Sequence, residues 1–140
     1  GTEYLTKEIE KLRQLCWRVA GVDRSSKGMS SALAKVKRDY QNLLNEPLLN
    51  LVFSQSKGVI NEFDEISRTD LNLLLDLSNR QMSSLLMLEA CLFRKESRGG
   101  HFRDDFPTSV PFWKCHTRQT KGKNIHTRPI FDNTGGPRNF

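Results

Sequence analysis

The sequence lacks the features by which many specialised classes of protein are identified. No apolar run approaches the ~20 residues that a helix needs to cross a membrane, and no signal-peptide pattern opens the chain. The three cysteines, Cys16, Cys91 and Cys115, are odd in number and are not closely paired, which argues against a disulfide framework. We therefore expect a cytoplasmic protein with no membrane partner.

Patterns typical of metal sites are also missing. The nearest candidate ligands are Cys115, His116, His126 and His101, and they show neither Cys-x-x-Cys nor His-x-x-x-His spacing. An adjacent Cys-His pair is poor geometry for one ion. The sequence therefore predicts no metal site.

The length and composition of the chain are those expected of one soluble domain. The chain has 140 residues, of which 36% are hydrophobic and 27% are charged. It begins with Gly1 and not with Met, from which we expect a piece of a longer polypeptide.

The most strongly patterned stretch lies in the second half of the chain. There, apolar and small side chains recur at steps of three and four residues, which is the period of a helix. The positions concerned are Leu71, Leu74, Leu75, Ser78, Met82, Leu85, Leu86, Glu89, Leu92 and Phe93. We predict a helix from Asp70 to Lys95, with Thr69 as its N-cap. Gly99-Gly100 is expected to supply the left-handed residue that ends it.

Two further helices are predicted upstream. The first begins at Thr6 as a cap and ends at Gly21, with a stripe formed by Ile9, Leu12, Cys16 and Val19. The second is capped by Ser25 or Ser26 and stops near Asn45, because the following Pro47 disfavours helix. Its buried face is expected to consist of Met29, Leu33, Val36, Tyr40, Leu43 and Leu44.

These helices predict an all-α fold, a three-helix bundle with the up-down-up course of a spectrin repeat. Residues 46–68 are expected to form a packing segment and an exposed loop, with room for a short extra helix. The tail is expected to be extended, with a small β-hairpin that pairs His116–Gln119 with Ile125–Arg128.

The predicted domain organisation has three parts. Residues 1–107 form the helical bundle domain, residues 108–131 an extended tail that packs on it, and residues 132–140 a disordered end. The bundle part ends in a charged motif, which is described below.

The positive charge of the chain is concentrated in its tail. Residues 98–140 carry eight Lys or Arg against three acidic residues, whereas residues 1–97 are nearly neutral. A basic tail of this kind can bind nucleic acid. Phe112 and Trp113, however, stand together beside Pro111 and are not interleaved with the basic residues. We therefore favour an acidic or anion-binding partner domain over nucleic acid.

A dense cluster of charge follows the third predicted helix. It reads Arg94-Lys95-Glu96-Ser97-Arg98-Gly99-Gly100-His101-Phe102-Arg103-Asp104-Asp105-Phe106-Pro107. The spacing Arg-x-Glu-Ser-Arg-Gly-x-His-x-Arg-x-Asp-Phe-Pro resembles a signature near the C-terminus of flavoproteins related to succinate dehydrogenase, fumarate reductase and L-aspartate oxidase. Upstream, the stretch from Trp17 through Gly21 and Val22 to Arg24 resembles the Trp-x-x-x-Gly-(Ile/Val)-x-Arg segment that opens the C-terminal helical domain of these flavoproteins.

The resemblance implies a C-terminal helical domain that packs against an upstream FAD-binding domain and a mobile capping domain. The dinucleotide fingerprint of the family, Gly-x-Gly-x-x-Gly, does not occur in this sequence. We therefore expect FAD in the full-length parent and none bound to this chain alone. The resemblance also implies that the substrate-binding residues of the family belong to the upstream domains, so we expect no catalytic residue in this chain.

The resemblance also makes the charged motif the candidate domain interface. The candidate residues are Arg94, Glu96, Arg98, His101, Arg103 and Asp105. Beyond Gly99-Gly100 the chain is expected to leave helical geometry, so that Arg98, His101 and Arg103 project from the bundle. Arginine is suited to bidentate contacts with carboxylates, phosphates and carbonyls of another domain. The alternatives are a solvated loop and braces within the bundle.

Two departures from the family pattern favour its L-aspartate oxidase branch. The segment after Pro107 leads directly to Trp113 without a charged insertion, and Gly100 stands where the respiratory enzymes usually have Ala. Trp113-x-x-His-Thr and Arg128-Pro129-Ile130 are instead similar to succinate dehydrogenase and fumarate reductase flavoproteins, which are the alternative. The first branch implies oxidation of L-aspartate to iminoaspartate in NAD biosynthesis, with oxygen or fumarate reoxidising the flavin and with quinolinate synthase as a partner.

Overall fold

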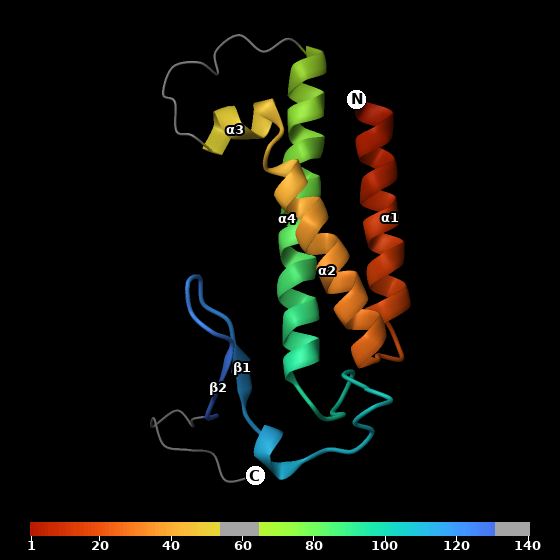
Figure 1. Cartoon of the computed structure of the whole chain (residues 1–140), viewed down its shortest axis with the longest axis vertical. Helices are drawn as coiled ribbons and strands as arrows, with labels where there is room; N and C mark the ends of the chain where they lie inside the picture. The colour runs from red at the N-terminus through yellow and green to blue at the C-terminus, as the bar shows by residue number, and fades with distance from the viewer. Residues whose placement is uncertain (54–64, 131–140) are drawn as a thin grey trace.

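Three long helices form the body of the molecule. They are α1 (Thr2–Ala20), α2 (Ser26–Leu43) and α4 (Glu65–Phe93), and α4 packs against both of the others. The computed structural model describes residues 1–53 and 65–130. Successive helices run in opposite directions, so that α1 and α4 descend while α2 rises between them (Figure 1). The predicted three-helix bundle with a small hairpin is confirmed.

The first residues of α1 and of α4 differ from the predicted ones. Helix α1 begins at Thr2, and Thr6 lies inside it, where its hydroxyl donates to the Thr2 carbonyl at 2.9 Å. The reason is packing, since Leu5 is buried in the lower-numbered part of α1 and extends the helix beyond the expected cap. Helix α4 begins at Glu65, so Thr69 lies within the helix and does not cap it.

Helix α2 follows the prediction more closely. Ser25 is its N-cap, and Ser25 Oγ accepts from the Gly28 amide at 3.1 Å. The helix ends at Leu43, near the expected stop. The short helix α3 (Pro47–Phe53) follows, with Leu49 completely buried. The loop predicted further along and the disordered end predicted for residues 132–140 fall outside the described residues.

The core consists of two apolar clusters along the bundle. One contains Ala20, Met29, Ala32, Val36, Leu85, Leu88 and Cys91. The other contains Leu5, Leu49, Leu74 and Leu77. Both clusters draw on α4, which is therefore the central helix of the fold.

The predicted face of α4 is only partly right. Leu85 is buried as expected, at 8% exposure, but Leu86 and Met82 are exposed. The true face includes Gln81 and Ser84, which the apolar pattern did not mark. Leucine occurs at so many α4 positions that several faces look apolar. Small side chains such as Ser84 allow α1 and α4 to approach, and this close approach selects the face.

A hairpin follows the bundle. Strand β1 (His116–Arg118) pairs antiparallel with β2 (His126–Arg128), and Thr117 lies opposite Thr127. This confirms the predicted hairpin. Gly122, with φ 76°, supplies the left-handed residue in the connection.

The tail contacts α4 before and within the hairpin. The rings of Phe93 and Trp113 meet edge to face with centroids 5.3 Å apart. Trp113 belongs to the short 3-10 helix η2 (Pro111–Trp113). Gln119 Nε2 donates to the Leu86 carbonyl at 3.0 Å. The division of the chain at residue 107 stays a prediction.

Candidate functional site

Arg103 is almost completely buried, with only 1% of its surface exposed. Its Nη1 donates to the carbonyl oxygens of Cys91 (3.2 Å), Leu92 (2.9 Å) and Arg94 (3.3 Å). Cys91 and Leu92 belong to the last turn of α4, whose carbonyls have no donor within the helix. Arg103 therefore caps the C-terminus of α4, where the helix dipole also favours a cation.

The remaining nitrogens of Arg103 reach the start of α2. Its Nη2 donates to Ser26 Oγ, and its Nε and Nη2 donate to the two carboxylate oxygens of Asp105 at 2.9 and 2.6 Å. Hydrogen bonds from Arg103, and to a lesser extent from Ser26, outweigh the effect of burial and lower the pKa of Asp105 to about 2. The amide of Asp104 donates to the Arg24 carbonyl at 2.9 Å. Together these contacts fasten the motif to the α1–α2 connection.

Glu96 is a second internal anchor and has no exposed surface. Its Oε1 accepts from Nε of Arg94 (3.1 Å) and Nε of Arg98 (2.9 Å), and its Oε2 accepts from the Val110 amide (3.0 Å). Burial alone raises the pKa of Glu96, but the hydrogen bonds from Arg98 and Val110 and the positive charges outweigh it. The pKa of Glu96 consequently lies below its ordinary value. A buried carboxylate with two cations is thus fully paired.

Arg94 fastens the tail to the end of α4. Its Nη1 and Nη2 donate to the Cys115 carbonyl at 3.1 and 2.9 Å, and Nη2 also donates to the Trp113 carbonyl. The guanidinium lies 5.7 Å from the centre of the Trp113 ring. Arg94 therefore contacts residues of the tail and does not project into solvent.

His101 is held by both of its ring nitrogens. Arg24 Nη1 donates to His101 Nδ1 at 2.7 Å, and His101 Nε2 lies 3.0 Å from the Arg94 carbonyl oxygen. A guanidinium can only donate and a carbonyl can only accept, so the imidazole is neutral with its hydrogen on Nε2. Burial and the charges of Arg24, Arg103 and Arg94 lower the pKa of His101. With both nitrogens engaged, His101 is not available for proton transfer.

Gly99 and Gly100 form a tight turn in this loop. The Arg98 amide donates to the His101 carbonyl at 2.8 Å, and the His101 amide donates to the Arg98 carbonyl at 3.0 Å. Gly99 has φ 56°, in the left-handed region that glycine favours. The prediction that this glycine pair ends the helix is wrong, because α4 already ends at Phe93 and is capped by Arg103.

The expectation that Arg98, His101 and Arg103 project from the bundle is therefore wrong for Arg103 and for His101. Arg103 is buried, and His101 is bonded on both sides. Only Arg98 keeps substantial exposure, although its guanidinium is bonded to Glu96. The physical reason is that the carbonyls at the end of α4 bind the Arg103 guanidinium, and the buried Glu96 carboxylate pairs with Arg98. The charged motif is thus a set of internal braces, and an interface role for these residues stays a hypothesis.

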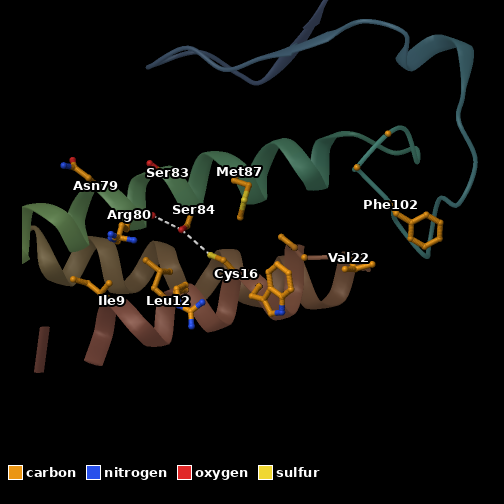
Figure 2. A pocket seen from close by; sticks show the side chains of 16 residues that line it. Ile9, Leu12, Cys16, Val22, Asn79, Arg80, Ser83, Ser84, Met87 and Phe102 are labelled. Atoms are coloured by element: carbon orange, nitrogen blue, oxygen red, sulfur yellow. Dashed lines mark hydrogen bonds between the residues drawn. The ribbon is translucent and has the colours of Figure 1, made fainter. Parts of the chain in front are cut away.

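An open groove on the surface of the bundle lies beside the charged motif. A groove of about 900 Å³ runs between α1 and α4 and ends at the Gly99-Gly100 turn. Its lining residues are Ile9, Leu12, Arg13, Cys16, Trp17, Ala20, Gly21, Val22, Asn79, Arg80, Ser83, Ser84, Met87, Gly99, Gly100 and Phe102. Figure 2 shows Cys16 and Ser84 meeting across its floor, where Cys16 Sγ donates to Ser84 Oγ at 3.3 Å.

Sequence reasoning missed the apolar character of this groove. Trp17 is 73% exposed and Val22 is 74% exposed, and Met87 and Phe102 are also exposed. The available signal was the Trp17–Arg24 stretch, whose resemblance to a family segment could have directed attention to its surface. The candidate metal ligands are not brought together, since no cluster of three or more potential ligands occurs in the described part of the chain. None of the helices in residues 1–53 and 65–130 has the length and apolar character of a membrane span.

Comparison with known proteins gives the family of the chain. Residues 9–134 match the family described as the fumarate reductase flavoprotein C-terminal domain, and the chain belongs to this family. It is 36% identical over 110 residues to an L-aspartate oxidase of Nostoc sp. strain PCC 7120, covering 77% of this chain and 19% of that protein. It is 34% identical over 127 residues to an L-aspartate oxidase of Synechocystis sp. strain PCC 6803, covering 85% of this chain and 22% of that protein.

A third relative widens the comparison. The chain is 30% identical over 106 residues to an uncharacterised FAD-dependent oxidoreductase of Methanocaldococcus jannaschii, covering 76% of this chain and 16% of that protein. No solved structure matches the chain significantly. The chain thus spans about a fifth of the length of the curated relatives it matches. The description of the family makes the matched segment the C-terminal part of a flavoprotein.

Proposed function

We propose that this chain is the C-terminal helical domain of an FAD-dependent L-aspartate oxidase. The observation that carries the proposal is its 34–36% identity to two L-aspartate oxidases over most of its length. The oxidised substrate is L-aspartate, which gives up a hydride from its α-carbon and a proton from its amino group to become iminoaspartate. FAD held by the rest of the enzyme would accept the hydride, and oxygen or fumarate would reoxidise it. The product serves quinolinate synthase in cytoplasmic NAD biosynthesis.

We assign the flavin and the substrate to the rest of the enzyme. The sequence of this chain contains no Gly-x-Gly-x-x-Gly turn that could hold a pyrophosphate at a helix N-terminus. The titratable groups of the motif are engaged with one another, as the paired Glu96 and the doubly bonded His101 show. A role in supporting the flavin and capping domains therefore fits these residues better than a role in proton transfer.

A hybrid enzyme tests the proposal. This chain would replace the matched C-terminal segment of the Nostoc L-aspartate oxidase, and the purified hybrid would be mixed with L-aspartate without oxygen. We expect the hybrid to retain flavin, and L-aspartate to bleach the visible flavin absorbance. A hybrid that binds flavin but is not reduced by L-aspartate would overturn the proposal.

The second candidate is a succinate dehydrogenase or fumarate reductase flavoprotein. It is favoured by the family description, which names fumarate reductase, and by the Arg128-Pro129-Ile130 ending. The same experiment with the native full-length polypeptide separates the two. Bleaching by succinate and not by L-aspartate selects the second candidate.

A further inference from the structure

One face of the bundle exposes more apolar surface than its own packing explains. Trp17, Val22, Met87 and Phe102 come from α1, the α1–α2 connection, α4 and the loop after α4, and all line the α1–α4 groove. Single exposed apolar residues are common on protein surfaces, but a contiguous patch marks an interaction site. Tryptophan and other aromatic residues are also enriched at interfaces.

The charged residues along the groove are already paired within their own helices. Arg13 Nη2 lies 2.7 Å from Glu10 Oε1, and Arg80 Nε lies 2.9 Å from Asp76 Oδ1. Ser84 Oγ donates to the Arg80 carbonyl at 2.7 Å while accepting from Cys16. The groove therefore presents an apolar surface whose two arginines and Ser84 are locally satisfied, which suits an apolar partner better than an anion.

The braces of the motif hold the lower end of this groove in shape. Arg103 and His101 fix the loop against α4 and the α1–α2 connection, and Phe102 stands between them in the sequence. Figure 2 shows Phe102 on the loop beyond the end of α4, with Val22 facing the same space from the α1 side. The motif thus presents the apolar Phe102 at the rim, while the neighbouring Arg103 is buried.

We propose that the α1–α4 groove, with Trp17, Val22, Met87 and Phe102, is the face that docks on an apolar surface of the flavin-binding part of the same polypeptide. This inference rests on the proposed function. The matched relatives are about five times as long as the segment they share with this chain, so most of each relative lies outside it. A second copy is the less suitable occupant, because the chain has a net charge of +6 and two copies repel each other.

Hydroxyl-radical footprinting of side chains tests this assignment. The oxidation rates of Trp17, Met87 and Phe102 are measured in the isolated 140-residue chain and in the Nostoc hybrid described above. We expect at least a fivefold fall in the hybrid for all three. Tyr4, which is also on α1 and is 63% exposed, serves as the control and is expected to keep its rate.

The outcomes separate this inference from the proposed function. A hybrid reduced by L-aspartate in which Trp17 reacts as fast as in the isolated chain overturns the docking face and leaves the function standing. A hybrid in which Trp17 is protected but L-aspartate does not reduce the flavin overturns the proposed function and leaves the docking face standing. Concentration-dependent dimerisation of the isolated chain that is abolished by Trp17→Ser assigns the groove to a second copy and also overturns the inference.

A second measurement does not depend on folding of the hybrid. The isolated chain is titrated against the Nostoc enzyme truncated before its matched segment, and binding is followed by sedimentation. Trp17→Ser combined with Phe102→Ser is expected to weaken binding at least tenfold, whereas Tyr4→Ser leaves it unchanged. Two outcomes count against the docking face: equal binding by the Trp17→Ser/Phe102→Ser variant and the Tyr4→Ser variant, or no binding by the unaltered chain.

Discussion

Replacing Arg103 by alanine tests whether the charged motif stabilises the bundle from within. The substitution removes the donor to the Cys91 and Leu92 carbonyls and leaves the Asp105 carboxylate without its cation. Hydrogen bonds to a charged group are worth about 1.5–3 kcal/mol each, and removal of one partner of a buried ion pair costs about 3–5 kcal/mol. Since these contacts share one side chain and Asp105 can rehydrate, we expect a total loss of about 3–5 kcal/mol.

That loss is a large part of the usual stability of a domain, about 5–15 kcal/mol. Urea unfolding of the isolated chain, followed by circular dichroism, measures it directly. With a slope of about 1.5 kcal/mol per M, the midpoint should fall by about 2–3 M. Arg103→Lys should lose less, because an ammonium can reach the helix carbonyls but cannot also reach Ser26 and Asp105.

Arg80→Ala is the matched control for this experiment. Arg80 lies on α4 and, like Arg103, is paired with an aspartate, but its side chain is half exposed. Exposed pairs of this kind contribute about 0.3–0.5 kcal/mol. If Arg103→Ala costs less than about 1 kcal/mol, the capping argument is refuted, and the guanidinium is free to serve another partner.

Three further predictions concern packing, pH and the turn. Leu85→Ala should cost about 2–5 kcal/mol and Leu86→Ala less than about 0.5, because only the first is buried; equal urea midpoints would show that the α4 face is misassigned. The pKa of His101 is lower in the folded chain than in the unfolded chain, so on acidification the unfolded chain is protonated at a higher pH. The free energy of unfolding should therefore be full above pH ~6.5 and fall below it. His101→Gln should flatten this dependence in urea titrations between pH 5 and 8. Gly99→Ala should lower stability by about 1 kcal/mol because of its positive φ, whereas Gly100→Ala should be nearly neutral in the isolated chain, and thermal melts that rank them oppositely would contradict the turn geometry.

Local signals were sufficient to predict the helices and the hairpin. Ser25 lies before an apolar stripe and caps α2 as expected, because an N-cap needs only a side-chain oxygen near the next few amides. The hairpin was similarly readable from its turn residues. Thr6 failed as a cap because the buried Leu5 continues α1 past a residue that would otherwise start it, and the contacts of Leu5 involve distant parts of the chain. Thr69 failed as a cap because α4 already begins at Glu65.

The charged motif was recognised from the sequence, but the orientation of its side chains was not predicted, and its role as an interface stays a prediction. The sequence located the motif correctly and gave its family, yet charge density after a helix suggested side chains that project outward. The partners that turn them inward are Ser26 and Arg24, which lie more than seventy residues from His101 and Arg103 in the sequence. No local pattern encodes that proximity. The groove was missed for the same reason, since its two walls come from α1 and α4.

The hairpin has a consequence for solubility. Its two strands share the sequence His-Thr-Arg, and their antiparallel register sets His116 opposite Arg128 and His126 opposite Arg118. A small exposed sheet ordinarily invites pairing with a neighbouring molecule along its edges, which leads to aggregation. Here, a second copy that approached either edge would bring its own arginines against those already present. We therefore expect the repeated tripeptide to give the sheet a repulsive border that disfavours edge-to-edge pairing of two copies.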